Sequence, residues 1–312
     1  MGSQTVVIGI PTYKRPIGLR RLLDSIAKQS CDFTPIVLIA DNEGDGGQGL
    51  QVAEQVKAEG YPWELHAIPV NERGISQVRN ALMQYGFEQL NAIHLAMIDD
   101  DEWVEPQWIA ELVKVQLATG AEVVGGSVSP EFETERPDWA KGLHIYYESN
   151  PGVSGKTELI QGTTNVLLSR SIIESFPTER FDPFYSLVGG GDKEFFTRIK
   201  RLGASFAFAH QAQAHELFTA SRLTKKWAVE RAYRIGAGDM RIIKNQQPRL
   251  LDWVKEFSKL SLALLISSLL ALIFLPIPHK HMKARLKLTR QLGKLSALWG
   301  KQRAVYTNVH GN

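Results

Sequence analysis

The sequence predicts an α/β fold: a Rossmann-like, mainly parallel sheet flanked by helices, followed by a C-terminal helical appendage. The first half of the chain alternates short β-rich runs with amphipathic helical patterns, which is typical of βαβ units. The 312 residues are 44% hydrophobic, enough for one large core. Residues 257–312 contain no Asp or Glu but nine Lys or Arg, a charge of about +9. Because the net charge of the whole chain is +3, residues 1–256 carry about −6. An acidic body and a basic tail therefore face different partners.

Strands are expected first, because apolar and β-branched residues dominate these runs: 6–10, 36–40, 64–68, 93–98 and 122–124. Amphipathic spacing predicts the intervening helices at 17–29, 50–59, 75–89 and 107–118. Prolines and glycines break the pattern over 129–157, which we expect to be an irregular excursion. Regular structure then returns at 159–168, in helices near 169–175 and 192–202, and in a strand at 204–209.

The segment 260–277 is almost wholly apolar. As a helix it reaches only about 27 Å, barely the thickness of a bilayer core. A buried core helix is one interpretation and a membrane crossing is another. Crossing would carry the basic tail to the side opposite the acidic body, against the positive-inside bias. We therefore predict an in-plane or re-entrant helix with both flanks in the cytosol.

The single cysteine, Cys31, excludes an intrachain disulfide framework and a zinc site built from cysteines. A reducing, cytosolic compartment fits this composition.

An apolar strand at 93–98 ends abruptly in Asp99, Asp100, Asp101 and Glu102. Ligands of open α/β sheets bind beyond the carboxyl ends of the strands, so these acids lie in the expected region. Their oxygens suit Mg²⁺ or Mn²⁺, and such an ion can bridge two phosphates. The alternative is that the acids only precede a helix that starts near Pro106, where the dipole favours negative charge.

The turn that follows the first strand carries Thr12, Tyr13 and Arg15, which can face a base or a phosphate. It lacks the glycines of a dinucleotide fingerprint or a P-loop, which disfavours dehydrogenases and kinases. Asp41 and Asn42 end the second strand in the same way.

Taken together, these pieces resemble the inverting glycosyltransferases of family 2, which share the GT-A fold, and in particular bacterial members that build exopolysaccharide or lipid-linked sugar chains. The matching segments occur in order over about residues 5–235: 10–15, 41–42, 72–80, 99–101, 162–165, 181–182 and 189–192.

This resemblance implies a nucleotide-sugar site with these members: Pro11, Thr12, Tyr13, Arg15, Asp41, Gly74, Arg79, Asp99, Asp100 and Asp101. It assigns Asp99 and Asp101 to a DxD pair, with Asp99 nearer the ribose and Asp101 on the metal. Physical chemistry agrees, because a bound cation stabilises the nucleoside diphosphate as it leaves.

By the same resemblance, the base that takes the proton of the acceptor hydroxyl is Asp192, with Glu194 as the fallback. The family has a Glu before this Asp, whereas this chain has Gly191. Asp192 also suits the N-cap of the helix that follows. The resemblance further suggests His215 as a third metal contact, and Arg222 and Arg231 as phosphate contacts. The alternative for the two arginines is a solvated basic face against the membrane.

We thus expect a GT-A catalytic domain over 1–235, with a nucleotide-sugar part at 1–127 and an acceptor part at 128–235. Residues 236–312 form the membrane-associating region. The implied enzyme moves a sugar from a nucleotide-diphospho-sugar, commonly a UDP-sugar, to a glycan or lipid-linked acceptor at the cytoplasmic face of the membrane, without nucleic acid as a partner. The alternatives are a sugar nucleotidyltransferase and a catalytically degenerate domain that binds glycan or membrane.

Overall fold

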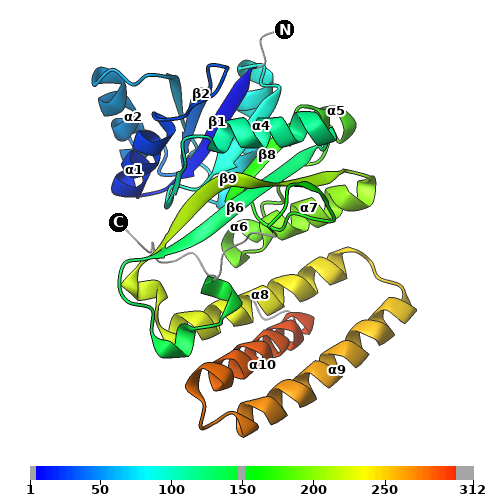
Figure 1. Cartoon of the computed structure of the whole chain (residues 1–312). Helices are drawn as coiled ribbons and strands as arrows, with labels where there is room; N and C mark the ends of the chain where they lie inside the picture. Colours follow the sequence, from blue (N-terminus) through cyan, green and yellow to red (C-terminus); the bar gives the residue numbers. More distant parts are fainter. Residues whose placement is uncertain (1–4, 147–151, 300–312) are drawn as a thin grey trace.

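The computed structural model describes residues 5–146 and 152–299, in which one sheet is flanked by helices on both faces (Figure 1). Its strands are β1 (Val6–Thr12), β2 (Ile36–Asp41), β3 (Glu64–Pro69), β4 (His94–Ile98), β5 (Glu102–Val104), β6 (Val123–Phe132), β7 (Gly155–Thr157), β8 (Asn165–Ser169) and β9 (Phe206–Phe218). Lys301 and Arg303 of the basic tail lie outside the described residues.

The helices begin with α1 (Pro16–Ile26), α2 (Gln48–Ala58), α3 (Ile75–Gln84), α4 (Trp108–Thr119), α5 (Ser171–Ser175), α6 (Tyr185–Val188) and α7 (Gly191–Leu202). A π-helical turn, Tyr85–Gln89, extends α3, and short 3₁₀ turns lie at Asp138–Ala140, His144–Tyr146 and Ala220–Arg222. Three long helices close the chain: α8 (Lys225–Asn245), α9 (Leu250–Ile273) and α10 (Pro278–Leu298). The helices and the first four strands expected in the first half are confirmed to within a few residues, whereas β5 is an additional strand and β6 is longer than expected.

The strand order is β3-β2-β1-β4-β8-β6-β9-β5, with β7 paired to β9. The part from β3 to β4 is parallel, as the βαβ pattern predicts. Beyond it, β8 runs antiparallel to both β4 and β6, so the sheet as a whole is mixed. The antiparallel return has a consequence for the site, because it sets Asn165 opposite Ile98 and brings the loop before β8 to the carboxyl end of β4.

The sheet is covered on both faces. On one side Leu19, Leu22, Trp108 and Leu112 of α1 and α4 pack on it. On the other side the cover comes from α3 and α7, with Phe195 among the buried side chains. Both layers are mainly apolar at the sheet surface, and α4 adds two polar contacts: Trp108 Nε1 donates to Asn165 Oδ1 of β8 at 2.8 Å, and Gln116 lies 2.9 Å from His94 Nε2 of β4.

The irregular excursion expected over 129–157 is shorter than predicted. Strand β6 continues to Phe132, and Gly155–Thr157 forms β7. The strand expected at 204–209 likewise continues to Phe218, because β6 and β9 pair from Phe206 to Ala209 and, after a bulge at residues 210–212, from Gln213 to Phe218. The two long strands run out from the sheet toward the C-terminal helices (Figure 1).

Helices α8, α9 and α10 form a layer below the sheet, with α10 between the other two (Figure 1). Helix α8 is continuous across residue 235, the boundary expected from the sequence, so any division of the chain falls at a loop before or after α8. Among the described residues, α9 is the one helix long and apolar enough to cross a membrane.

Candidate active site

The buried carboxylate of Asp100 fastens the turn after β1 to the end of β4. Thr12 Oγ1 and the Tyr13 backbone N–H donate to its Oδ2, at 2.8 and 3.4 Å. Arg15 Nη1 donates to its Oδ1 at 2.9 Å. Burial raises the pKa of Asp100 to about 6, against the opposing field of Arg15. Asp100 is only 4% exposed, so its role in the structure is to shape the turn.

Asp99 and Asp101, on either side of Asp100, are partly exposed and face arginines from three separate segments. Arg79 of α3 lies 3.4 Å from Asp99. Arg15 Nη1 and Arg222 Nη2 lie 3.0 and 2.7 Å from Asp101 Oδ2. Burial would raise the pKa of Asp101, but Arg222 and Arg15 outweigh it and hold that pKa below its usual range. The site thus combines exposed carboxylate oxygens with convergent guanidiniums.

Asp192 lies beside this pair, although it is far away in the sequence. It occupies the first turn of α7, and Arg79 Nη1 donates to its Oδ1 while Arg79 Nη2 reaches Asp99. The Thr163 backbone N–H donates to Asp192 Oδ2 at 3.4 Å. The structure therefore brings together three of the residues expected at the site, with the buried Arg79 as the link between two carboxylates.

Close packing explains why a glycine stands at position 191, where the resemblance leads us to expect Glu. A Cβ at this position would meet Tyr185 Cβ at 3.2 Å and Ser76 Oγ at 3.5 Å, and Tyr185 is fully buried. A larger residue at 191 would crowd α6 against α3.

Glu194, the fallback base, faces away from the cluster. Its carboxylate accepts from Arg198 Nε and Nη2, at 2.8 and 3.1 Å.

Gly74 is the N-cap residue just before α3, and its φ of 141° is a conformation that favours glycine. Its N–H donates to Asn42 Oδ1 at 2.8 Å, and a Cβ would meet Ser186 Cβ at 2.5 Å. Asn42 also donates to the backbone oxygens of Val70 and Glu72. These hydrogen bonds fix the loop that leads into α3, the helix that carries Arg79.

Asp41 does not face the site, contrary to expectation. Its side chain is 0% exposed, and its Oδ1 accepts from the Glu43 N–H at 2.8 Å. Its Oδ2 accepts from the N–H groups of Gly49 and Leu50, at 2.7 and 3.2 Å. Asp41 therefore caps the start of α2, because an anion at a helix N-terminus satisfies otherwise unpaired N–H groups.

The expectation that His215 contacts the metal is also wrong in this structure. His215 pairs across the strands with Trp103, and its ring stacks on that indole with centroids 5.3 Å apart. Its nitrogens lie 2.8 and 3.4 Å from Glu105 and Glu131. Side chains alternate along a strand, so the next residue, Glu216, faces the acidic cluster in its place.

Sequence reasoning missed Glu216, whose Oε1 lies 3.0 Å from Arg222 Nη1. Burial and the charge of Asp101 raise the pKa of Glu216 to about 7. The alternation of polar and small residues from Gln211 to His215 puts Glu216 on the face opposite His215, but it does not say which of the two faces meets the acids.

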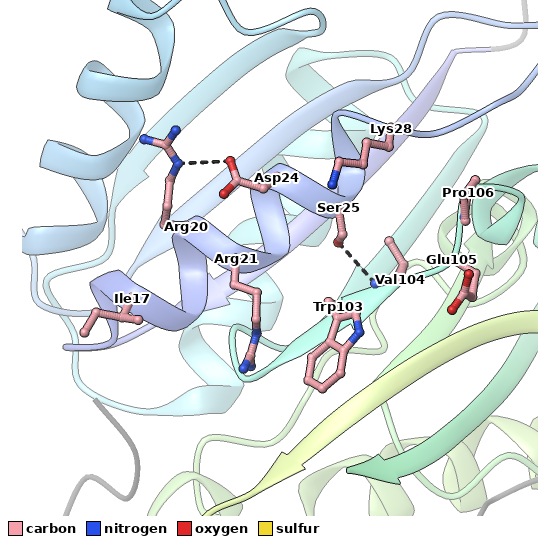
Figure 2. A pocket seen from close by; sticks show the side chains of 10 residues that line it. All are labelled: Ile17, Arg20, Arg21, Asp24, Ser25, Lys28, Trp103, Val104, Glu105 and Pro106. Atoms are coloured by element: carbon pink, nitrogen blue, oxygen red, sulfur yellow. Dashed lines mark hydrogen bonds and ion pairs between the residues drawn. The ribbon is translucent and has the colours of Figure 1, made fainter. Parts of the chain in front are cut away.

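An open cavity of about 550 Å³ lies behind the acidic turn, between α1 and β5 (Figure 2). Arg21 lines it and donates to the backbone oxygen of Asp101 at 2.8 Å. The guanidinium also lies 4.4 Å from the Trp103 ring centroid, and the same indole stacks on His215. None of the expected site residues lines this cavity.

The family model that matches the chain is that of glycosyl transferase family 2, over residues 7–176. The chain is 29% identical over 238 residues to the succinoglycan biosynthesis protein ExoM of Rhizobium meliloti, covering 76% of this chain and 74% of that protein. It is 24% identical over 186 residues to the putative glycosyltransferase EpsH of Bacillus subtilis, covering 57% of this chain and about half (52%) of that protein.

Solved structures show the same fold at low sequence identity. S. aureus TarS 1–349 in complex with UDP matches with a TM-score of 0.50 and 13% identity, over 95% of this chain and 92% of that chain. The crystal structure of S. aureus TarS matches with a TM-score of 0.52 and 13% identity, over 94% and 55% of the respective chains.

Proposed function

The chain belongs to glycosyl transferase family 2, and from that premise we propose that it moves a sugar from a nucleotide-diphospho-sugar to an acceptor hydroxyl with inversion. The observation that carries this proposal is the juxtaposition of Asp99, Arg79 and Asp192 at the carboxyl end of β4. It sets a candidate base beside a candidate diphosphate site, which a single displacement requires.

The donor part of the proposal rests on the arginines. Arg15, Arg79 and Arg222 come from three segments and converge on carboxylates. Guanidiniums form bidentate, charge-assisted hydrogen bonds with phosphate oxygens as well as with carboxylates. A diphosphate can therefore bind these arginines in place of the carboxylates. Pro11, Thr12 and Tyr13 lie at the same carboxyl edge of the sheet. The TarS structure that contains UDP has the same fold, which makes a UDP-sugar our first choice of donor.

A divalent ion fits the exposed oxygens of Asp99 and Asp101. The described residues contain no group of three His, Cys, Asp or Glu side chains placed to hold a metal. Two carboxylates are nevertheless a suitable partial set for Mg²⁺, which keeps several waters and shares substrate phosphates. We propose that these two residues hold Mg²⁺ or Mn²⁺ together with the donor. The ion would supply charge stabilisation to the departing diphosphate.

Asp192 is proposed as the base that takes the proton of the acceptor hydroxyl while that oxygen attacks the anomeric carbon. Arg79 and the Thr163 N–H hold its carboxylate in place. They supply the orientation that a neighbouring Glu would give, so Gly191 is compatible with a working base. Such assistance is worth about 10²–10⁴ in rate.

We propose a glycan or lipid-linked acceptor in exopolysaccharide synthesis, at the cytoplasmic face of the membrane. The similarity to the succinoglycan biosynthesis protein ExoM supports a role in polysaccharide synthesis. The exposed apolar helix α9 supports a membrane-proximal acceptor. In this proposal residues 1–127 bind the donor, the segment from 128 to about 235 faces the acceptor, and the C-terminal helices meet the membrane.

The test is calorimetric binding of UDP and GDP with Mn²⁺, without metal, and to the Asp99→Ala/Asp101→Ala variant. We expect tight, metal-dependent binding of one nucleotide, lost in the variant. A folded wild-type chain that binds neither nucleotide would favour the degenerate-domain alternative.

The base is tested by turnover of the labelled nucleotide-sugar. Asp192→Asn should retain donor binding and lose turnover by about 10²–10⁴. Glu194→Gln is the matched control, two residues further along α7, and this variant should keep turnover. The reverse outcome would assign the base to Glu194.

A further inference from the structure

Helix α9 exposes an apolar stripe. It comprises Leu262, Leu265, Leu269 and Leu272 at i+3 and i+4 spacing, with Leu251 and Val254 on the same face beyond the exposed Ser258. Leu265 is 69% exposed and Leu272 is 66% exposed, values unusual for large apolar side chains on one helix. At about 1.5 Å per residue the helix is about 36 Å long. Such a face needs a partner.

The opposite face of α9 is fixed to α10. Lys294 Nζ lies 2.6 Å from Glu256 near the start of α9, and His281 Nδ1 lies 2.9 Å from the Ala271 oxygen near its end. Leu260 is 2% exposed and packs in a small core with residues of α8 and α10. Both ends of α9 are therefore held against the same neighbouring helix.

Helix α10 is in turn locked to α8, which follows directly from the catalytic sheet. Arg290 donates through Nε to Asp239 Oδ2 at 2.9 Å, and Lys193 of α7 lies 2.8 Å from the other oxygen. A Cβ on Gly236 would meet the Arg290 oxygen at 1.9 Å, so the two helix backbones touch. Since α10 starts where α9 ends and stays on α8, α9 cannot cross a bilayer without unpacking this layer.

Charge identifies the partner. Lys255 and Lys259 are exposed one turn apart on α9, and Lys280, Lys283 and Lys287 are exposed on α10. No Asp or Glu occurs after Glu256. A symmetric pairing of two copies through α9 would bring these like charges together, whereas an anionic lipid surface would neutralise them. Basic residues beside a large apolar face are the pattern of an interfacial helix.

We infer that α9 lies in the plane of one leaflet of an anionic membrane, with its apolar stripe among the acyl chains and the lysines of α9 and α10 at the headgroups. This inference deepens the proposed function, because it places the transferase on the surface that carries its acceptor. Its test requires no turnover, so its failure is distinguishable from failure of the proposed reaction.

The first experiment is flotation of the full chain with vesicles of phosphatidylcholine alone and of phosphatidylcholine with phosphatidylglycerol. We expect binding to the anionic vesicles, reduced more than about tenfold by Leu265→Asp/Leu269→Asp, since charge inside the apolar region is costly. The matched control is Leu117→Asp, an equally apolar and 58% exposed position on α4, which should bind like wild type. Wild-type binding unaffected by the α9 variant would overturn the inference, as would a stable dimer that dissociates in that variant and ignores vesicles.

A second measurement separates lying in the plane from crossing. In a Cys31→Ser background, single cysteines are placed at Gln247 and His279, before and after α9. On sealed anionic vesicles both should react with an impermeant maleimide added outside. Labelling at 247 with protection at 279 would show a crossing and contradict the in-plane orientation.

Discussion

Single carboxylates at the carboxyl edge of the sheet have divided roles. Asp41 and Asp100 are buried and accept hydrogen bonds that shape the chain, whereas Asp99 and Asp101 keep exposed oxygens. The difference arises from direction, because neighbouring residues in a turn point to different sides of it. Charge density alone therefore overstates the number of carboxylates available to a ligand.

Asp41→Ala distinguishes a cap from a nucleotide contact. Because the Asp41 carboxylate accepts three N–H bonds, we expect the variant to lower the free energy of unfolding by about 1 kcal/mol, the usual scale for a helix cap. Nucleotide affinity should stay within a factor of two or so of wild type. Urea unfolding and calorimetry measure the two quantities. Unchanged stability with a large loss of affinity would restore the nucleotide contact.

At the site, the sequence identifies the acidic residues of the turn after β4 better than it identifies the side chains from other strands that face them. The run of acids after an apolar strand predicts the edge where Asp99 and Asp101 lie. It cannot show that Glu216 rather than His215 faces them, since that depends on the register between β5 and β9. Register is set by pairing between distant segments, and a one-residue shift would exchange the two side chains.

Among the elements, α8 and α10 meet at unusually close range. Gly236 and Gly293 allow it, because added Cβ atoms would lie 1.9 and 2.1 Å from the backbone oxygens of Arg290 and Tyr233. The sequence predicts the helices of this region but not their contact, since a glycine in a helix signals low propensity as readily as close packing. The same limit applies to the lengths of β6 and β9, whose pairing defines them.

Gly236→Ala tests this contact. Pushing the two backbones apart should destabilise the chain by about 1–3 kcal/mol in urea unfolding. Gly238→Ala in the same helix is the control, since its Cβ would meet only the Gly189 oxygen at 3.9 Å. It should be neutral or stabilising by up to about 1 kcal/mol. Equal effects of both substitutions would mean that helix propensity, and not the α8–α10 contact, governs stability here.

Asp239 connects the same helices to α7, which carries Asp192. Burial alone would raise the pKa of Asp239, but hydrogen bonds from Lys193 and Arg290 hold it below its usual range. A depressed carboxyl pKa adds stability that is present above the unfolded pKa and is lost as pH falls through the folded one.

We therefore expect Asp239→Asn to destabilise the chain by about 2 kcal/mol at pH 7, with a difference from wild type that shrinks below pH 3.8, the ordinary pKa of the group. Urea unfolding at pH 7, 5 and 3.5 measures it. Asp24→Asn, which removes an exposed ion pair with Arg20, should show no comparable change. A deficit that is constant with pH would mean that packing, rather than charge, holds Asp239.

For the whole molecule, the proposed orientation of the C-terminal layer would relate membrane binding to the proposed sugar transfer. The sheet, α8 and α10 form one packed unit, so a chain seated through α9 presents its site at a set height above the lipid. Attraction between surface lysines and anionic headgroups is screened by salt, with a Debye length of about 10 Å at 0.1 M and about 3 Å at 1 M.

Raising the salt concentration should therefore lower turnover on a vesicle-bound acceptor more than turnover on a soluble acceptor glycan. The soluble reaction should still depend on the proposed diphosphate contacts of Arg15, Arg79 and Arg222, whose guanidiniums are partly buried and less screened. The measurement is turnover of both acceptors across a salt series, with vesicle flotation in the same buffers. Leu265→Asp/Leu269→Asp serves as the control, because it should keep soluble turnover and show weak vesicle turnover at every salt concentration. An equal loss of turnover on both acceptors would locate the salt effect at the donor site and would exclude membrane binding through α9 as its cause.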